Sequence, residues 1–132
     1  MKNKNNAIGL FDSGIGGLSV LKQFSRFLPS ESFVYLGATA RVPYGNKSTQ
    51  TVVEYSRQCA KFLTSQDVKL IVIACNTASA LALDVVQDMV DVPVIGMINP
   101  AAKAALISSQ NSRIGVIGTR ATIESKAYQN EI

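Results

Sequence analysis

The sequence predicts an α/β fold: a parallel sheet with helices on both of its faces. Short apolar runs of strand length alternate with longer segments whose apolar residues recur at helical spacing. The segment at 68–75, VKLIVIAC, contains a continuous apolar run after Lys69, which indicates a strand buried on both sides. At 132 residues, with 47% hydrophobic and 17% charged residues, the chain is long enough to form a real core.

The first predicted unit is a strand at 7–11 (AIGLF), followed by a glycine turn (DSGIGG) and a helix at 18–28. Pro29 ends this helix, because proline cannot continue it. The apolar positions of the helix are Leu18, Leu21, Phe24 and Leu28.

The second unit is a strand at 32–37, an irregular segment (ATARVPYGNKS) and a helix from about 49 to 65. The apolar face of this helix is expected to hold Val52, Tyr55, Cys59, Phe62 and Leu63. Three further units follow in the same order. Their strands are expected at 68–75, 92–98 and 112–119, and their helices at 77–90, 99–109 and 120–132.

A weak internal repeat accompanies this alternation. AIGLFDSG and RIGVIGTR share an Ile-Gly pair, an apolar position and a turn, and each opens a strand-to-helix unit. One interpretation is two similar halves, of which the second is only begun, joined through the segment around Gly96 and Pro100. The chain is therefore expected to be incomplete relative to a finished fold.

Composition narrows the function classes. The net charge is +4, or +2 without Lys2 and Lys4 of the polar leader, and no basic cluster supports nucleic-acid binding. The apolar run at 7–11 is shorter than a secretory core of roughly 7–15 residues or a membrane helix of roughly 20. Two cysteines without framework spacing, and no histidine, argue against a disulfide scaffold or zinc site and favour a reducing, cytoplasmic setting.

Polar residues follow four of the predicted strands at their carboxyl ends. In parallel sheets ligands bind beyond these ends, so the sequence predicts one site there. The candidates are Asp12 and Ser13, Pro43 to Gly45, Cys75 to Thr77, and Thr119 to Thr122.

The two cysteines are expected to differ. Cys59 lies on the apolar face of its helix and is interpreted as a small buried residue. Cys75 ends a strand and precedes Asn76 and Thr77 at a helix start, where the helix dipole favours a thiolate. Because the chain has no histidine to activate a nucleophile, a Cys–His hydrolase cannot be assembled from it alone. The thiolate can instead act as a base on a carbon next to a carboxylate.

The remaining candidates each keep two interpretations. The turn DSGIGGLS fits neither GxGxxG nor the P-loop pattern, and is either a tight packing turn or a backbone site for a carboxylate. Asp12 is either a helix cap or a carboxylate that steers a proton. The segment RVPYG (41–45) is a rigid turn whose amides, with Tyr44, could close one wall of a pocket.

Five blocks spanning nearly the whole chain resemble the glutamate racemases. They are GLFDSGIGGLSVLK, YLGATARVPYGNKS, VIACNTASA, VPVIGMINPA and IGVIGTRATIES, with AY following Lys126. Aspartate and hydantoin racemases are related, but the opening FDSGIGGLSVL resembles them less. The resemblance implies a flavodoxin-like lobe and a cofactor-independent enzyme that interconverts L- and D-glutamate, supplying D-glutamate for peptidoglycan.

In this family one cysteine removes the α-proton and a second, on the opposite face, returns one. The resemblance implies that Cys75 is one of the pair, and Asp12 is the other candidate catalytic residue. Positions matching the family's substrate contacts are Asp12, Ser13, Pro43, Tyr44, Gly45, Asn76, Thr77, Thr119 and Thr122. No metal or cofactor is implied.

The chain departs from the family in two places. Ala38 stands where the family usually has Asp, and the second cysteine block, similar to GCTHYP, does not occur. Residues 1–97 would form most of a first lobe and 98–132 the start of a second, so the chain alone is expected to be inactive. The alternative is a non-catalytic carboxylate-binding or regulatory module. The expected partner is glutamate, with no nucleic acid or membrane, and a homodimer is left open.

Overall fold

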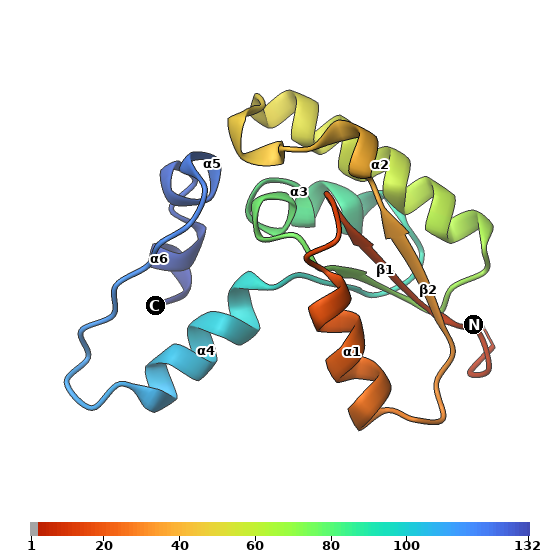
Figure 1. Cartoon of the computed structure of the whole chain (residues 1–132), viewed down its shortest axis with the longest axis horizontal. Helices are drawn as coiled ribbons and strands as arrows, with labels where there is room; N and C mark the ends of the chain where they lie inside the picture. Colours follow the sequence, from red (N-terminus) through yellow and green to blue (C-terminus); the bar gives the residue numbers. More distant parts are fainter. Residues whose placement is uncertain (1–2) are drawn as a thin grey trace.

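The computed structural model describes residues 3–132, and its centre is a four-stranded parallel sheet in the order β2-β1-β3-β4 (Figure 1). The strands are β1 (Ile8–Asp12), β2 (Phe33–Gly37), β3 (Leu70–Ile73) and β4 (Val94–Ile95). In the central strand, Ile8 lies opposite both Phe33 and Leu70. This order is that of flavodoxin-like sheets, and it confirms the predicted fold class.

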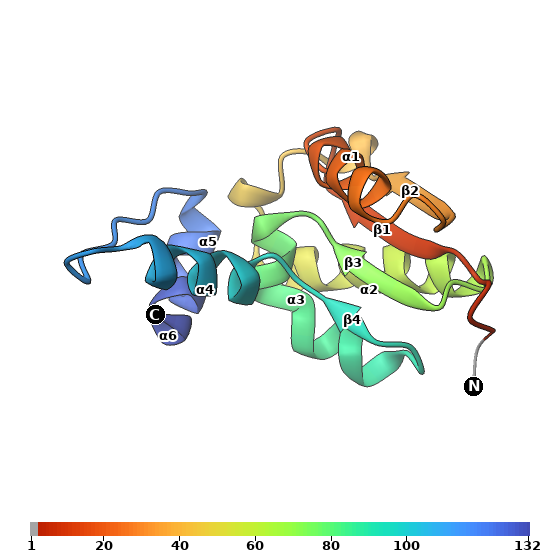
Figure 2. The ribbon, with the colours of Figure 1, turned by 90° about the horizontal axis from the view of Figure 1, so that it is seen from below.

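Helices cover both faces of this sheet. Helix α1 (Leu18–Phe27) lies on one face, and α2 (Thr49–Ser65) and α3 (Asn76–Met89) lie on the other (Figure 2). Successive residues of β1 serve the two layers, since strand side chains alternate: Leu10 packs toward α1, and Phe11 packs toward α2 and α3.

The predicted apolar faces of the first two helices are partly wrong. In α1, Leu18 and Leu28 are exposed, and Val20 packs on the sheet together with Leu21 and Phe24. In α2, Phe62 is 46% exposed. Small residues, Ser56 and Ala60, occupy buried positions of α2 instead, together with Val52, Cys59 and Leu63. Small side chains let α2 approach α3 closely, which a count of large apolar residues does not anticipate.

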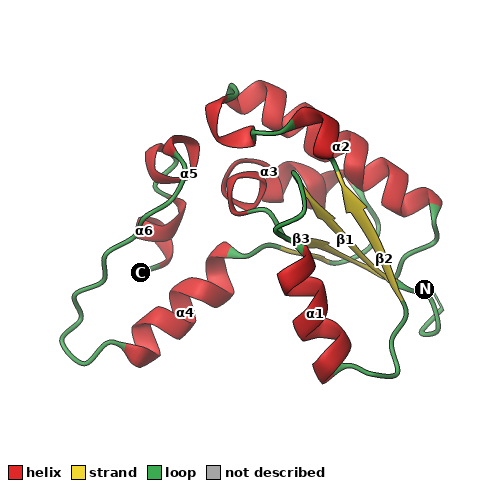
Figure 3. Ribbon diagram, in the orientation of Figure 1, coloured by secondary structure: helices red, strands yellow, loops and turns green. Residues whose placement is uncertain are grey.

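Two 3₁₀ turns, η1 (Thr39–Arg41) and η2 (Tyr44–Asn46), join β2 to α2, in the segment expected to be irregular. After β4 the chain forms α4 (Ile98–Ser108), α5 (Arg120–Glu124) and α6 (Ala127–Glu131). Helix α4 leads away from the sheet, and a loop returns the chain so that α5 lies beside the start of α3 and α6 packs on α4 (Figures 1 and 3).

The strand expected at 112–119 does not form, and this prediction is wrong. Residues 113–119 are irregular, and Ile117 is 99% exposed. A strand is held by hydrogen bonds to a neighbour, and α4 has carried this segment away from the sheet. The strand expected at 92–98 is likewise reduced to Val94–Ile95, because Ile98 already begins α4.

The single helix expected at 120–132 is also wrong. Lys126 adopts a left-handed conformation with φ of 57°, which ends α5 and lets α6 start in a new direction.

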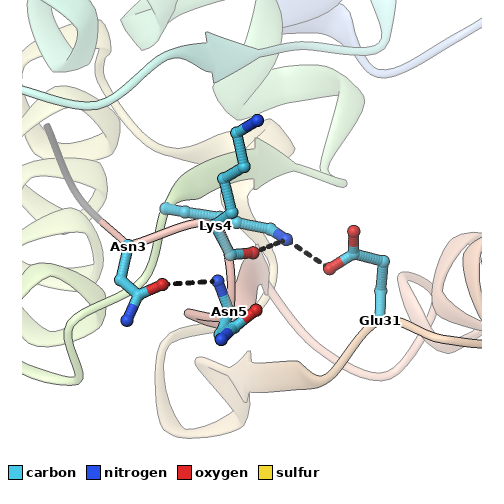
Figure 4. A network of polar contacts seen from close by, with 5 residues as sticks. Asn3, Lys4, Asn5 and Glu31 are labelled. Carbon is cyan, nitrogen blue, oxygen red and sulfur yellow. Dashed lines mark hydrogen bonds and ion pairs between the residues drawn. The ribbon is translucent and has the colours of Figure 1, made fainter.

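Near the N-terminus, the side chain of Lys69 holds the first described residues. Its Nζ donates to the carbonyl oxygen of Lys4 over 2.6 Å and pairs with Glu31 (Figure 4). No helix among residues 3–132 has the length and apolar character to cross a membrane.

Candidate active site

A cleft of about 680 Å³ opens at the carboxyl ends of β1 and β3. The turn after β1 and the start of α3 form its floor, while α4, Thr119 and Tyr128 approach from the second part of the chain. The position agrees with the predicted site, because parallel strands direct the loops that follow them to one edge. The predicted residues that line the cleft are Asp12, Ser13, Cys75, Asn76, Thr77 and Thr119.

Cys75 is the N-cap of α3, so its sulfur lies where the helix has unsatisfied N–H groups. Sγ accepts a hydrogen bond from the N–H of Ala78 over 3.4 Å. The thiol in turn donates to Oγ of Ser13 over 3.6 Å. The side chain is 7% exposed and faces the cleft, and the helix start stabilises negative charge on the sulfur.

Asp12 organises the glycine turn between β1 and α1. Its Oδ2 accepts hydrogen bonds from the N–H groups of Gly14 (3.0 Å) and Gly17 (3.1 Å). Gly17 must be glycine for this turn to close, because a Cβ there would lie 2.7 Å from Cβ of Asp12. Asp12 is thus not the helix cap that the sequence allowed, because the N-cap of α1 is Gly17 and no side chain caps it; the carboxylate instead holds the turn before α1. Its place in the cleft leaves a part in proton transfer as a prediction.

Three threonine hydroxyls tie α5 to the start of α3. Oγ1 of Thr119 lies 2.8 Å from Oγ1 of Thr77 and 2.9 Å from Oγ1 of Thr122. Thr119 also caps α5 by accepting from the N–H of Thr122. Thr122 itself is buried beneath Thr119 and does not line the cleft, so its contribution here is to hold Thr77 and Thr119 in place.

None of the three predicted residues Pro43, Tyr44 and Gly45 lines the cleft. Tyr44 is 2% exposed, packs its ring on Tyr55, and forms no hydrogen bond through its hydroxyl to any part of the described chain. Burial raises the pKa of Tyr44, and the nearby thiols of Cys59 and Cys75 raise it further. Gly45 packs against Thr119, which lines the cleft, so this turn contacts the site through Thr119.

Tyr128 is a cleft residue that the sequence did not single out. Its hydroxyl donates to Oδ1 of Asn76 over 2.6 Å, a contact between residues 52 positions apart. The one available signal was the position of Tyr128 in the last of the five blocks. The hydrogen bond fixes the side-chain amide of Asn76 beside Cys75.

Cys59 is outside the cleft, as predicted. It is 4% exposed in α2, and burial raises the pKa of its thiol. Within residues 3–132, no cluster of three His, Cys, Asp or Glu side chains is close enough to hold a metal ion. The arrangement therefore offers one cleft-facing thiol, a hydroxyl beside it, and amide and hydroxyl groups around it.

Comparisons with known proteins find relatives similar in sequence and in fold. The profile of the Asp/Glu/Hydantoin racemase family matches residues 14–132. A glutamate racemase of Geobacter metallireducens is 53% identical over 96% of this chain and 47% of its own length. The solved glutamate racemase of Aquifex pyrophilus is 53% identical, with a TM-score of 0.93 over 95% of this chain and 50% of that one. That of Francisella tularensis, solved with D-glutamate, is 46% identical, with a TM-score of 0.87 over 96% of this chain and 48% of that one. The chain thus spans about half the length of the relatives it matches.

Proposed function

The chain belongs to the Asp/Glu/hydantoin racemase family, and from that membership we propose that it supplies one catalytic face of a glutamate racemase. The observation that carries the proposal is the sulfur of Cys75, which caps α3 and faces the cleft beside Ser13. A glutamate racemase of known structure was solved with D-glutamate, which supports an amino acid as the ligand of this cleft.

The proposed reaction begins with glutamate lying above Cys75. The thiolate takes the α-proton, so that the Cα–H bond breaks, an S–H bond forms, and the electron pair remains on the carbon next to the carboxylate. Ser13 and Asn76 lie within the cleft to hold the carboxylate and ammonium groups. Delivery of a proton to the opposite face of the carbon then gives the other enantiomer.

The second proton needs a group on the far face of the substrate. Cys59 cannot supply it, because it lies in α2 outside the cleft, and the sequence has no histidine. We therefore propose that this group comes from a segment that corresponds to the part of the relatives not covered by these residues. We further propose that residues 1–97 belong to a first lobe and residues 98–132 form the start of a second. We propose that the whole enzyme is cytoplasmic and provides D-glutamate for peptidoglycan. The proposal is compatible with a monomer or a homodimer.

The test uses the full reading frame that contains these residues. A frame of roughly 260 residues, the size of two ordinary domains, with a second cysteine in its later half would agree with the proposal. Racemisation of L-glutamate, followed by circular dichroism, should be lost in Cys75→Ser and retained in Cys59→Ser. A full-length protein that binds glutamate without racemising it would instead support a non-catalytic binding module.

A further inference from the structure

A second cavity, of about 320 Å³, lies between η1 and α2. It shares no lining residue with the active-site cleft. The residues that shape it are Leu36, Ala38, Arg41, Gln58, Cys59 and Phe62, and we refer to it as the arginine pocket. Its size is at the lower end of the range for small-molecule sites.

Arg41 supplies the charge of the arginine pocket. Its guanidinium carbon lies 4.4 Å from the centre of the Tyr55 ring, a cation–π contact that restrains the group. Among residues 3–132 the structure has one ion pair, between Lys69 and Glu31. No carboxylate of these residues therefore lies within ion-pairing distance of Arg41. The guanidinium is therefore a half-buried, pre-oriented donor with no acidic partner in the described part of the chain.

The rest of the arginine pocket is mostly apolar. Leu36, Ala38 and Phe62 contribute carbon surface, and Phe62 is 46% exposed. The carboxylate nearest along the helix is Glu54, and the amide of Gln58 donates to it over 2.9 Å. Position 38 carries only a methyl group, so it adds no charge opposite Arg41.

We propose that the arginine pocket binds a small carboxylic acid, with the carboxylate on Arg41 and an apolar body against Leu36 and Phe62. Planar, bidentate pairing with a carboxylate is the interaction for which a fixed guanidinium is best suited. An apolar body covers the exposed face of Phe62 and displaces water from it. This inference does not depend on the proposed racemase function.

The first test uses benzoate as the probe, with benzamide as its uncharged match, in ¹H–¹⁵N titrations of the 132-residue chain. Benzoate should shift the backbone amide resonances of residues 37–41 and 58–62. Benzamide should bind at least about tenfold more weakly than benzoate, because it lacks the negative charge. Equal affinity for the two probes, or shifts confined to the active-site cleft, would overturn the proposal. Shifts at 37–41 that grow with protein concentration alone would assign the pocket to a second copy and overturn it too.

Two substitutions test the role of Arg41. Arg41→Gln should weaken benzoate binding about tenfold, whereas Arg57→Gln, which changes an exposed cation of α2 outside the pocket lining, should leave it unchanged. Ala38→Asp leaves the Arg41 and Tyr55 side chains themselves unchanged and places a competing carboxylate in the pocket, so it should weaken binding by a similar factor. Unaltered binding in both pocket variants contradicts the proposal.

Cys59 offers an independent readout because it lines the arginine pocket and Cys75 does not. Saturating benzoate should slow the alkylation of Cys59 at alkaline pH several-fold and leave that of Cys75 unaltered. Equal protection of both thiols, or protection of Cys75 alone, would count against a ligand in this pocket.

Discussion

The sulfur of Cys75 lies 3.6 Å from the hydroxyl oxygen of Ser13, although 62 positions separate the two residues in the sequence. One follows β3 and the other follows β1, and these strands are neighbours in the sheet. The pair connects the two turns that form the floor of the cleft. While the thiol is protonated, it donates to the hydroxyl oxygen of Ser13. When the thiol loses its proton, the same hydroxyl is placed to donate to the thiolate.

The thiols should react at different rates. At neutral pH, iodoacetamide should alkylate Cys75 before Cys59, because Cys75 faces the cleft at a helix start and burial raises the pKa of Cys59. Peptide mapping after brief treatment measures the order, and Cys75→Ser should leave only the slow reaction. Simultaneous labelling of both residues, or Cys59 first, would contradict the site.

The close approach at Gly17 should be visible in stability. Gly17→Ala should lower the free energy of unfolding by about 1–3 kcal/mol, since the new Cβ would lie 2.7 Å from Cβ of Asp12. Gly16→Ala is the matched control, because its Cβ would meet Oδ2 of Asp12 at an ordinary 3.8 Å. Urea unfolding measures both, and an equal effect of the two changes would show that the approach of Gly17 is not limiting.

Two tyrosine hydroxyls provide a matched pair. Tyr35 donates to the carbonyl oxygen of Gly14 over 3.1 Å, so Tyr35→Phe should cost about 1 kcal/mol. The buried hydroxyl of Tyr44 has no hydrogen-bond partner in residues 3–132, so Tyr44→Phe should be neutral or stabilising. Thermal unfolding distinguishes them. A larger loss in Tyr44→Phe would mean that this hydroxyl has a partner in solution.

Stability should fall at alkaline pH. Burial raises the pKa of Cys59 and Tyr44 above their ordinary values of 9.0 and 10.0. Above these values the unfolded chain loses protons that the folded chain keeps, so each group lowers stability by up to about 1.4 kcal/mol per pH unit. Urea unfolding between about pH 8 and pH 11 should show the decline, with a shallower slope above pH 10 in Tyr44→Phe. An unchanged slope in that variant would exclude Tyr44 as a source.

The 132-residue chain alone should not racemise L-glutamate appreciably. It has one thiol in the cleft, and a proton returned to the same face regenerates the starting enantiomer. A general acid or base contributes roughly 10²–10⁴ in rate, so the loss of one leaves little turnover. Circular dichroism measures racemisation, and proton NMR in deuterated water measures slow exchange of the α-hydrogen. Turnover near that of a longer relative would require a second base from another copy.

Local pattern was sufficient for much of the sheet and for the centre of the site. The apolar runs that became β1, β2 and β3 are short and bounded by turn residues, and parallel strands direct the following loops to one edge. Cys75 could be placed there from the sequence because its neighbours, Asn76 and Thr77, begin a helix directly after a buried strand. For these elements the information lies within a few residues of the position it specifies.

Tertiary structure decided what depends on partners distant in the sequence. Residues 113–119 have the apolar pattern of a strand but lie beyond reach of the sheet, and hydrogen bonding between strands is a non-local interaction. Whether Tyr44 faces the cleft or the core, and whether Tyr128 reaches Asn76, likewise depends on how α5 packs against α3 and η2 and how α6 packs against α4. In the sequence, Arg41 is a basic residue of a predicted turn, and nothing near it in the chain predicts its contacts. Only the packing shows that its guanidinium lies over the Tyr55 ring and has no acidic partner in the described residues. Propensity and periodicity act along the chain, whereas burial and pairing are set by segments that meet only when it folds.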